Sequence, residues 1–251
     1  MERVSFLNNR GQRLYGNLFH AKNAGGTGVL FSHGLFSSKD GYKINRMADA
    51  IAAEGYDLLA FDFSFTGESG GDMTSLSVLQ EIEDLRCAAG FFVENVSKNI
   101  HFIGSSMGAA VSILYLSESP AEALSLAGIA TPADLRGLIT GNTSIKNPGS
   151  LPAEGRTELQ GIMIKNSFFR EIDAINMAEA MERITVPVLA IHGGRDIVVP
   201  PSNVEILERH ILSSFKKVII GDGDHNLVRD SDINLIRDEL LSWFSSHTCP
   251  E

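Results

Sequence analysis

"HFIGSSMGAAVSI", residues 101–113, is the stretch that decides the fold. An apolar run ends there in two serines, and glycines stand on either side of them. The order is a strand, then Gly104-x-Ser106-x-Gly108, then a helix, which is typical of a sharp turn that exposes a nucleophile. The question is which of the two serines, Ser105 or Ser106, carries the chemistry.

The spacing of the glycines answers this question. In so tight a turn the chain passes close to the nucleophile on both sides, so the residues two before and two after it have no room for a side chain. For Ser106 these two positions are Gly104 and Gly108, whereas for Ser105 they hold an isoleucine and a methionine. We therefore predict that Ser106 is the nucleophile and that Ser105 is its neighbour.

Apolar strands alternate with amphipathic helices along most of the chain. We expect strands over 2–8, 13–21, 27–34, 56–63, 98–104, 123–131, 186–194 and 216–223, and helices over 41–55, 77–96, 200–211 and 232–246. This alternation predicts an α/β fold whose mostly parallel central sheet has helices on both faces. The first two strands, joined by a turn at 9–11, predict an antiparallel hairpin at one edge.

Two helix ends carry recognisable signals. Ser77 and Gln80 have the spacing of a capping box at the start of the helix over 77–96. Gly55 stands where a helix commonly ends with a residue of left-handed conformation.

The segment 132–185 breaks the alternation, because it is longer than a strand–helix–strand connection requires. Turn signals occur at 147–149 and 153–155, and TELQGIMIK alternates weakly like a strand. We expect a small cap made of a partial hairpin and a helix near 170–182. The chain is thereby divided into an α/β core, residues 1–131 and 186–251, and an inserted cap or lid, residues 132–185.

A serine hydroxyl needs an adjacent base to act as a nucleophile. His225 follows the last strand in a polar loop, at the sheet edge where open α/β folds bind their ligands, and the Ser106 turn lies at the same edge. His101 begins its strand and therefore lies at the opposite end of the sheet. Surface or packing roles explain the other candidates better: His20, His192, His210 and His247.

The base in turn needs a carboxylate that fixes its tautomer. Asp196 is the best candidate, since it follows the strand 186–194 at the same edge. Asp222 and Asp224 are rivals in the histidine loop, although aspartates so close in sequence more often cap turns. Asp62 also ends a strand, and we expect it to bond local loop amides.

The order Ser106, Asp196, His225 resembles that of the α/β-hydrolase family. Four segments match the family in the right order: HG at 33–34, FDFSFTGES at 61–69, GSSMG at 104–108, and GGRDIVVP with GDGDH at 193–200 and 221–225. Within the family the chain looks most like the serine-aminopeptidase-like and feruloyl (cinnamoyl) esterase-like branch. It departs from the usual pattern where Thr66 precedes Gly67.

The resemblance also implies an oxyanion hole. The family uses the amide after the nucleophile, here that of Met107, and one from the loop after the HG strand, here that of Leu35. Backbone donors already in place at a helix N-terminus stabilise a developing oxyanion. We expect His33 to orient this loop.

Together these residues predict a serine hydrolase that cleaves a small carboxylic ester through an acyl-enzyme intermediate, without a metal or organic cofactor. A thioesterase or an aminopeptidase-like amidase of the same fold is the alternative among enzymes, and a noncatalytic ligand-binding protein is the alternative outside them. Apolar residues expected to line the substrate pocket are Leu35, Phe36, Ile162, Met163, Ile164, Phe168 and Phe169. Phe168 and Phe169 have a second interpretation, in which they merely pack the insertion onto the core.

Composition narrows the partners. The chain has 251 residues, 43% of them hydrophobic, and a formal net charge of -10. So acidic a chain does not favour nucleic acid or anionic membranes as partners. The cysteines, Cys87 and Cys249, predict neither a disulfide framework nor a metal site. With no apolar run of about 18 residues and no signal-peptide pattern, we expect a cytoplasmic monomer or homodimer without a membrane span.

Overall fold

The central sheet has eight strands in the order β1-β2-β4-β3-β5-β6-β9-β10. The computed structural model describes residues 1–22 and 26–248. The strands are β1 (Glu2–Leu7), β2 (Arg13–Phe19), β3 (Thr27–Ser32), β4 (Asp57–Phe61), β5 (Asn99–Ser105), β6 (Ala123–Ile129), β9 (Val188–Gly193) and β10 (Phe215–Ile220). The six neighbouring strands β4, β3, β5, β6, β9 and β10 are parallel to one another. Strands β1 and β2 form an antiparallel pair at one edge, and β2 is also antiparallel to β4. The predicted fold class and the predicted hairpin are confirmed.

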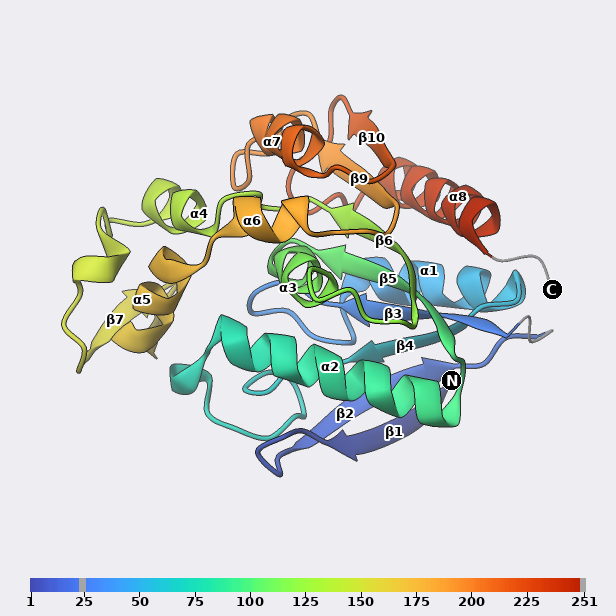
Figure 1. The fold of residues 1–251 in the computed structure, drawn as a ribbon, viewed down its shortest axis with the longest axis horizontal. Helices are drawn as coiled ribbons and strands as arrows, with labels where there is room; N and C mark the ends of the chain where they lie inside the picture. The colour runs from blue at the N-terminus through green and yellow to red at the C-terminus, as the bar shows by residue number, and fades with distance from the viewer. Residues whose placement is uncertain (23–25, 249–251) are drawn as a thin grey trace.

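Helices cover both faces of this sheet (Figure 1). They are α1 (Tyr42–Ala53), α2 (Val78–Asn95), α3 (Met107–Leu116), α6 (Met177–Glu182), α7 (Ser202–His210) and α8 (Asp230–His247). One core joins α1 and α8 to the sheet, and a second core on the opposite face joins α2, α3, α6 and α7 to it. Strand β5 shows the reason: Ile100 and Phe102 belong to one core and Ile103 to the other, because successive side chains of a strand point to opposite faces.

The two predicted helix ends have different outcomes. Gly55 follows α1 with a φ of 98°, the left-handed conformation expected there. The Ser77 hydroxyl accepts the Gln80 amide at 3.2 Å, so half of the capping box forms. The Gln80 side chain does not complete the box, since it donates to the Asp84 carboxylate at 2.9 Å instead.

The segment 132–185 lies between β6 and β9, and most of it extends beyond the sheet at one end of the molecule (Figure 1). It contains α4 (Leu135–Asn142), a short 3-10 turn (Pro148–Ser150), the hairpin strands β7 (Arg156–Leu159) and β8 (Ile162–Lys165), α5 (Asn166–Ala174) and α6. The hairpin agrees with the expected partial hairpin, and the weakly alternating stretch 157–165 is divided between its two strands. The helix expected near 170–182 is two helices, because Ile175 is extended and Asn176 caps α6 through the Glu179 amide.

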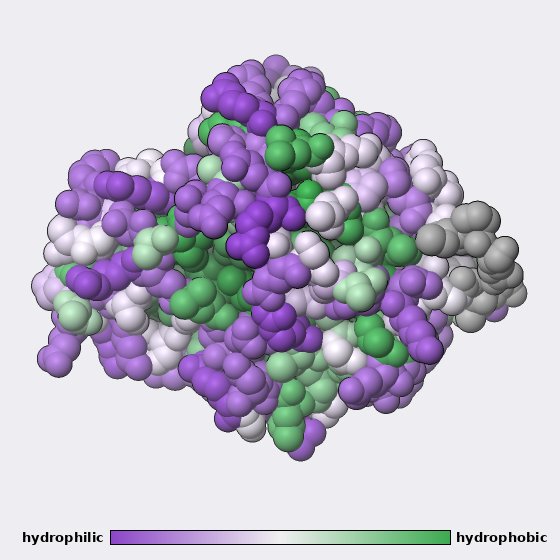
Figure 2. Space-filling view, in the orientation of Figure 1, coloured by the Kyte–Doolittle hydropathy of each residue, from purple (hydrophilic) through white to green (hydrophobic). Residues whose placement is uncertain are grey.

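A second short 3-10 turn lies at Met73–Ser75. The face shown in Figure 2 is largely hydrophilic. On the face shown in Figure 2, apolar residues gather between the segment that extends beyond the sheet and the centre of the molecule. In the described part of the chain, no helix is long and apolar enough to cross a membrane, and no cluster of three or more His, Cys, Asp or Glu side chains is placed to hold a metal ion. Cys87 carries a free thiol, and Cys249 lies outside the described residues.

Candidate active site

Ser106 occupies the turn between the end of β5 and the start of α3. Its backbone has φ 51° and ψ −120°, in a region that non-glycine residues rarely adopt. Its amide donates to the Ile129 carbonyl on β6 at 2.8 Å, which holds the turn against the neighbouring strand. Strain of this kind persists only where the surrounding structure fixes it, and such sites are often functional.

The glycines on either side have the steric role that the sequence suggested. A Cβ at Gly104 would collide with the backbone of Ala109, and a Cβ at Gly108 would collide with the carbonyl oxygens of Ser32 and His33. The backbone thus approaches the turn from both sides. Both serines line the cavity described below, but Ser105, the last residue of β5, is buried, whereas Ser106 is half-buried.

Three side chains from three sheet-edge turns form one hydrogen-bonded chain. The Ser106 hydroxyl lies 3.1 Å from Nε2 of His225, and Nδ1 of His225 lies 2.7 Å from Oδ2 of Asp196. The Asp196 side chain is completely buried, while that of His225 is 18% exposed. In the arrangement that satisfies both contacts, the hydroxyl donates to Nε2 and the Nδ1–H donates to the carboxylate.

Asp196 is held as a carboxylate by its surroundings. Its Oδ1 accepts the amides of Val198 and Val199 at 2.9 and 2.8 Å. Burial alone would raise the pKa of this carboxyl, but hydrogen bonds from His192, from His225 and from a main-chain amide outweigh it and hold the pKa well below its usual range. Asp196 therefore stays negative beside the imidazole.

His192 is a supporting residue that sequence reasoning missed. We predicted packing for it, and it is indeed buried on β9. Its Nε2 donates to the Val199 carbonyl at 2.8 Å and lies 3.4 Å from Oδ2 of Asp196. A histidine four residues before a candidate acid was the available signal.

The rival carboxylates are engaged elsewhere. Asp222 pairs with Arg195 at 2.6 Å on the exposed surface, and Asp224 accepts the amides that follow it in its own loop. Asp62 accepts the Lys39 and Glu68 amides at 2.7 and 3.0 Å, as expected, and also binds the buried Lys39 ammonium at 3.0 Å. None of the three approaches His225 within hydrogen-bonding distance in the described part of the chain.

His33 fixes the loop that follows β3. Its Nδ1 donates to the Gly34 carbonyl at 2.8 Å, and its Nε2 accepts the Phe63 amide at 3.2 Å. Burial lowers its pKa, which favours the neutral ring that this pattern requires. A Cβ at Gly34 would lie 3.3 Å from the Cβ of Ser106, so the loop passes directly beside the turn.

The loop places the two amides expected to form an oxyanion hole in the same cavity wall. Leu35 and Met107 both line the cavity into which Ser106 opens. Within residues 1–22 and 26–248, neither main-chain amide donates to another protein group. Both are therefore available to a ligand oxygen.

His101 lies at the far end of β5, bonded to the Ser125 hydroxyl, where burial lowers its pKa to about 3.

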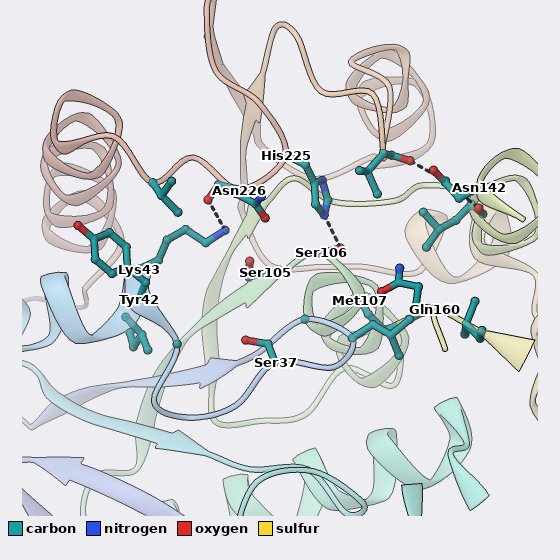
Figure 3. A pocket seen from close by; sticks show the side chains of 18 of the residues that line it. Ser37, Tyr42, Lys43, Ser105, Ser106, Met107, Asn142, Gln160, His225 and Asn226 are labelled. Carbon is teal, nitrogen blue, oxygen red and sulfur yellow. Dashed lines mark hydrogen bonds between the residues drawn. The ribbon is translucent and has the colours of Figure 1, made fainter. Parts of the chain in front are cut away.

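The cavity at Ser106 has a volume of about 430 Å³, within the usual range for small-molecule sites. Figure 3 shows Ser106 and His225 near its middle. Its wall combines the sheet edge, the start of α1, and the inserted segment, which contributes Leu138, Ile139, Asn142, Thr143, Leu159 and Gln160. Sequence reasoning did not identify Tyr42, Lys43 and Asn142 in this wall, because nothing in their local pattern distinguishes them from surface residues of a helix.

Most of the expected pocket residues do not line this cavity. Of the expected residues, only Leu35 lines the cavity. The residues that do not line it are Phe36, Ile162, Met163, Ile164, Phe168 and Phe169. Phe168 and Phe169 are fully buried and meet edge to face at 5.3 Å between ring centres, so they pack the inserted segment onto the core. Met163 is 47% exposed on β8, and the hairpin instead meets the cavity with Leu159 and Gln160.

Comparison with known proteins agrees with this geometry. Residues 27–140 match the family described as serine aminopeptidase, S33. The chain is 25% identical over 236 residues to the mitochondrial palmitoyl-protein thioesterase ABHD10 of Mus musculus, covering 89% of this chain and 76% of that protein. It is also 25% identical over 240 residues to Lipase 1 of Psychrobacter immobilis, covering 81% and 72% of the two chains.

The fold is shared with solved structures. Est1E from Butyrivibrio proteoclasticus with bound ferulic acid superposes with a TM-score of 0.83 at 17% identity, over 97% of this chain and 98% of that one. The match to the S33 family and the superposition confirm the resemblance that the sequence motifs indicated. The protein therefore has the α/β-hydrolase fold, and its residues 27–140 match the sequence pattern of the serine aminopeptidase S33 family.

Proposed function

We propose that this protein is a serine hydrolase that cleaves carboxylic esters through a covalent acyl-enzyme. One observation carries the proposal: the hydrogen-bonded chain from Ser106 through His225 to the buried Asp196 begins in a cavity of about 430 Å³. A nucleophile, its base and the group that orients the base are thus in contact, and the nucleophile faces a space of substrate size.

The proposed reaction has two steps. The Ser106 oxygen attacks the ester carbonyl while Nε2 of His225 takes the hydroxyl proton. The amides of Leu35 and Met107 donate to the oxyanion that forms. His225 then gives the proton to the leaving alcohol, and the carbon–oxygen bond breaks. A water molecule, deprotonated by the same histidine, then attacks the acyl group. The bond from the acyl carbon to the Ser106 oxygen breaks, His225 returns the proton to that oxygen, and the acid is released.

Asp196 contributes electrostatically to both steps. Its carboxylate accepts the Nδ1–H of His225, which leaves Nε2 free to take the proton from Ser106. When the imidazole becomes positively charged, the buried negative charge beside it stabilises that state. The amides of Val198 and Val199 and the nearby His192 keep the carboxylate in place.

A thioester is the second candidate substrate. The observation that favours it is the similarity to the ABHD10 proteins, which are named palmitoyl-protein thioesterases. The same nucleophile, base and oxyanion donors serve for either leaving group. Amide cleavage by an aminopeptidase-like activity and ligand binding without turnover are the remaining alternatives.

The test is turnover of matched substrates by three proteins. Wild type, Ser106→Ala and Ser105→Ala are assayed with p-nitrophenyl esters of increasing chain length, with acyl thioesters and with an aminoacyl anilide. We expect ester turnover by wild type and Ser105→Ala, and a loss of at least about a thousandfold in Ser106→Ala. A faster reaction with thioesters favours the second candidate. If wild type cleaves none of these substrates, the ligand-binding alternative replaces the proposal.

A further inference from the structure

Lys43 is the charged side chain of the cavity wall. Among the described residues that line the cavity there is no aspartate, glutamate or arginine, and His225 and Tyr42 are the other titratable groups. The chain as a whole has 31 acidic and 21 basic residues. The side chains that line the cavity therefore carry a positive charge, whereas the chain as a whole carries a negative net charge.

The contacts of Lys43 leave most of its donors free. Its Nζ donates to the Asn226 carbonyl at 3.0 Å, and no carboxylate oxygen lies within 4 Å of it in the described part of the chain. Lys39, four residues earlier, shows the contrast: its ammonium pairs with Asp40, Asp62 and Glu68 at 3.0, 3.0 and 2.8 Å. Lys39 is a satisfied structural cation, whereas two of the three N–H groups of Lys43 have no acceptor among the residues that the structure describes.

The nearest negative charges do not neutralise Lys43. Asp224 and Asp196 raise its pKa through space, but both are bound to other groups, Asp224 to amides of its own loop and Asp196 to His225. Burial has the larger effect and lowers the pKa of Lys43 from 10.5 to about 8. The group is therefore still positively charged at neutral pH, and a partly desolvated cation without a counter-charge is costly unless a ligand pairs with it.

We infer that Lys43 binds a carboxylate of the substrate, so that the preferred ester carries one negative charge apart from the bond that is cleaved. Figure 3 shows Lys43, Tyr42 and Asn226 on one side of the Ser106–His225 pair, and Met107, Gln160 and Asn142 on the other. One ammonium among neutral donors fits a singly charged carboxylate better than a doubly charged phosphate. The inference rests on the proposed ester hydrolysis and adds a substrate class to it.

A purely structural role is the competing explanation. The bond from Lys43 to the Asn226 carbonyl ties α1 to the residue after His225, so the lysine also holds the histidine loop. A positioning role alone would affect neutral and acidic esters equally. The ratio of kcat/KM for an acidic ester to that for a neutral ester of the same length separates the two roles, because a shared loss cancels in the ratio.

The experiment compares such pairs in wild type, Lys43→Met and Lys43→Arg. Monomethyl glutarate, adipate and suberate are paired with methyl pentanoate, hexanoate and octanoate, which places the charge on the acyl side. The 4-acetoxybutanoate anion is paired with butyl acetate, which places it on the alcohol side. Arg46→Met is the matched control, since Arg46 lies one turn further along α1, pairs with Asp230 at 2.8 Å and does not line the cavity.

We expect the acid-to-neutral ratio of at least one pair to fall about 10- to 100-fold in Lys43→Met, as for loss of a charged hydrogen bond. Lys43→Arg should retain most of the ratio, and Arg46→Met should leave it unchanged. Equal ratios in wild type and Lys43→Met for every pair would overturn the inference while leaving ester hydrolysis standing. If wild type cleaves none of these esters, neutral or acidic, the proposed function itself is overturned.

Discussion

The carboxyl edge of the sheet and the segment 132–185 both line one cavity, and they are built differently. At the sheet edge, Ser106, Asp196 and His225 follow β5, β9 and β10, of which β5 and β9 are buried, and close backbone contacts hold the turns. The inserted segment meets the cavity with α4 and a hairpin whose strands have four residues each. The candidate reacting groups are thus fixed by the main sheet, while the inserted segment adds six residues from short elements to the cavity wall.

Removing the charge of Asp196 should have the largest effect at the sheet edge. In Asp196→Asn the His225 ring loses the acceptor that fixes its tautomer, so kcat should fall about 10³- to 10⁴-fold. Steady-state kinetics with a p-nitrophenyl ester measures this. Asp222→Asn is the matched control, because Asp222 is exposed and pairs with Arg195. A similar loss in both variants would mean that the acid has been misassigned.

Filling the space beside the nucleophile should disturb the same wall sterically. Gly108→Ala would place a Cβ against the carbonyl oxygens of Ser32 and His33, and we expect a loss of about 2–3 kcal/mol in the free energy of unfolding, together with reduced turnover. Gly90→Ala is the control: that glycine is exposed in α2 with open space around it, so alanine should add up to about 1 kcal/mol of stability. Urea denaturation compares them, and equal effects would refute the close approach.

The depressed pKa of Asp196 gives stability with a defined pH range. A carboxyl whose pKa is lower folded than unfolded contributes stability that is fully present above its unfolded pKa of about 4 and is lost as the pH falls below it. Unfolding free energies of wild type and Asp196→Asn, measured between pH 6 and pH 3, should therefore converge as the pH falls. A constant difference over this range would contradict the assignment.

The smallest effect on activity is expected from a change in the inserted segment 132–185. The Asn142 side chain donates to the Val198 carbonyl at 2.8 Å, and both residues, with Leu138, also line a second cavity of about 260 Å³. Asn142→Ala removes this hydrogen bond where the two cavities share lining residues, so a long acyl chain should reach the second cavity more easily. The preference for decanoyl over butyryl esters should therefore rise about fivefold. Asn95→Ala, which removes a comparable exposed bond on α2, is the control. An unchanged preference would show that the second cavity takes no acyl chain.

The sheet edge and the inserted segment also differ in how far the sequence predicts them. The turn at Ser106 follows from local rules, because only glycine fits two residues before and after the serine. Asp196 and His225 each lie in the loop after a strand that the sequence predicts. Parallel strands end at one edge, so three distant segments are brought together without knowledge of the strand order. The order of the sheet, β1-β2-β4-β3-β5-β6-β9-β10, was not predicted, because it depends on pairing between distant strands.

The structure of the inserted segment 132–185 depends on packing that no local sequence pattern specifies. Helix α4 contains Gly137 and Gly141, which disfavour a helix, and it forms because Asp134 caps it and Leu135 and Ile139 are buried. Apolar character alone did not reveal which way α5 faces. The sequence therefore leaves two interpretations of Phe168 and Phe169, pocket lining or packing, and the helix turns both side chains into the core.

The central claim is that Ser106 is the nucleophile of this cavity. The most direct measurement is labelling of the wild-type protein with a fluorophosphonate, which reacts covalently with an activated serine, followed by proteolysis and mass spectrometry of the modified peptide. The account predicts one added phosphonyl group on Ser106, with no labelling of Ser106→Ala and full labelling of Ser105→Ala. Label on Ser105, or an intact protein of unchanged mass, would contradict it.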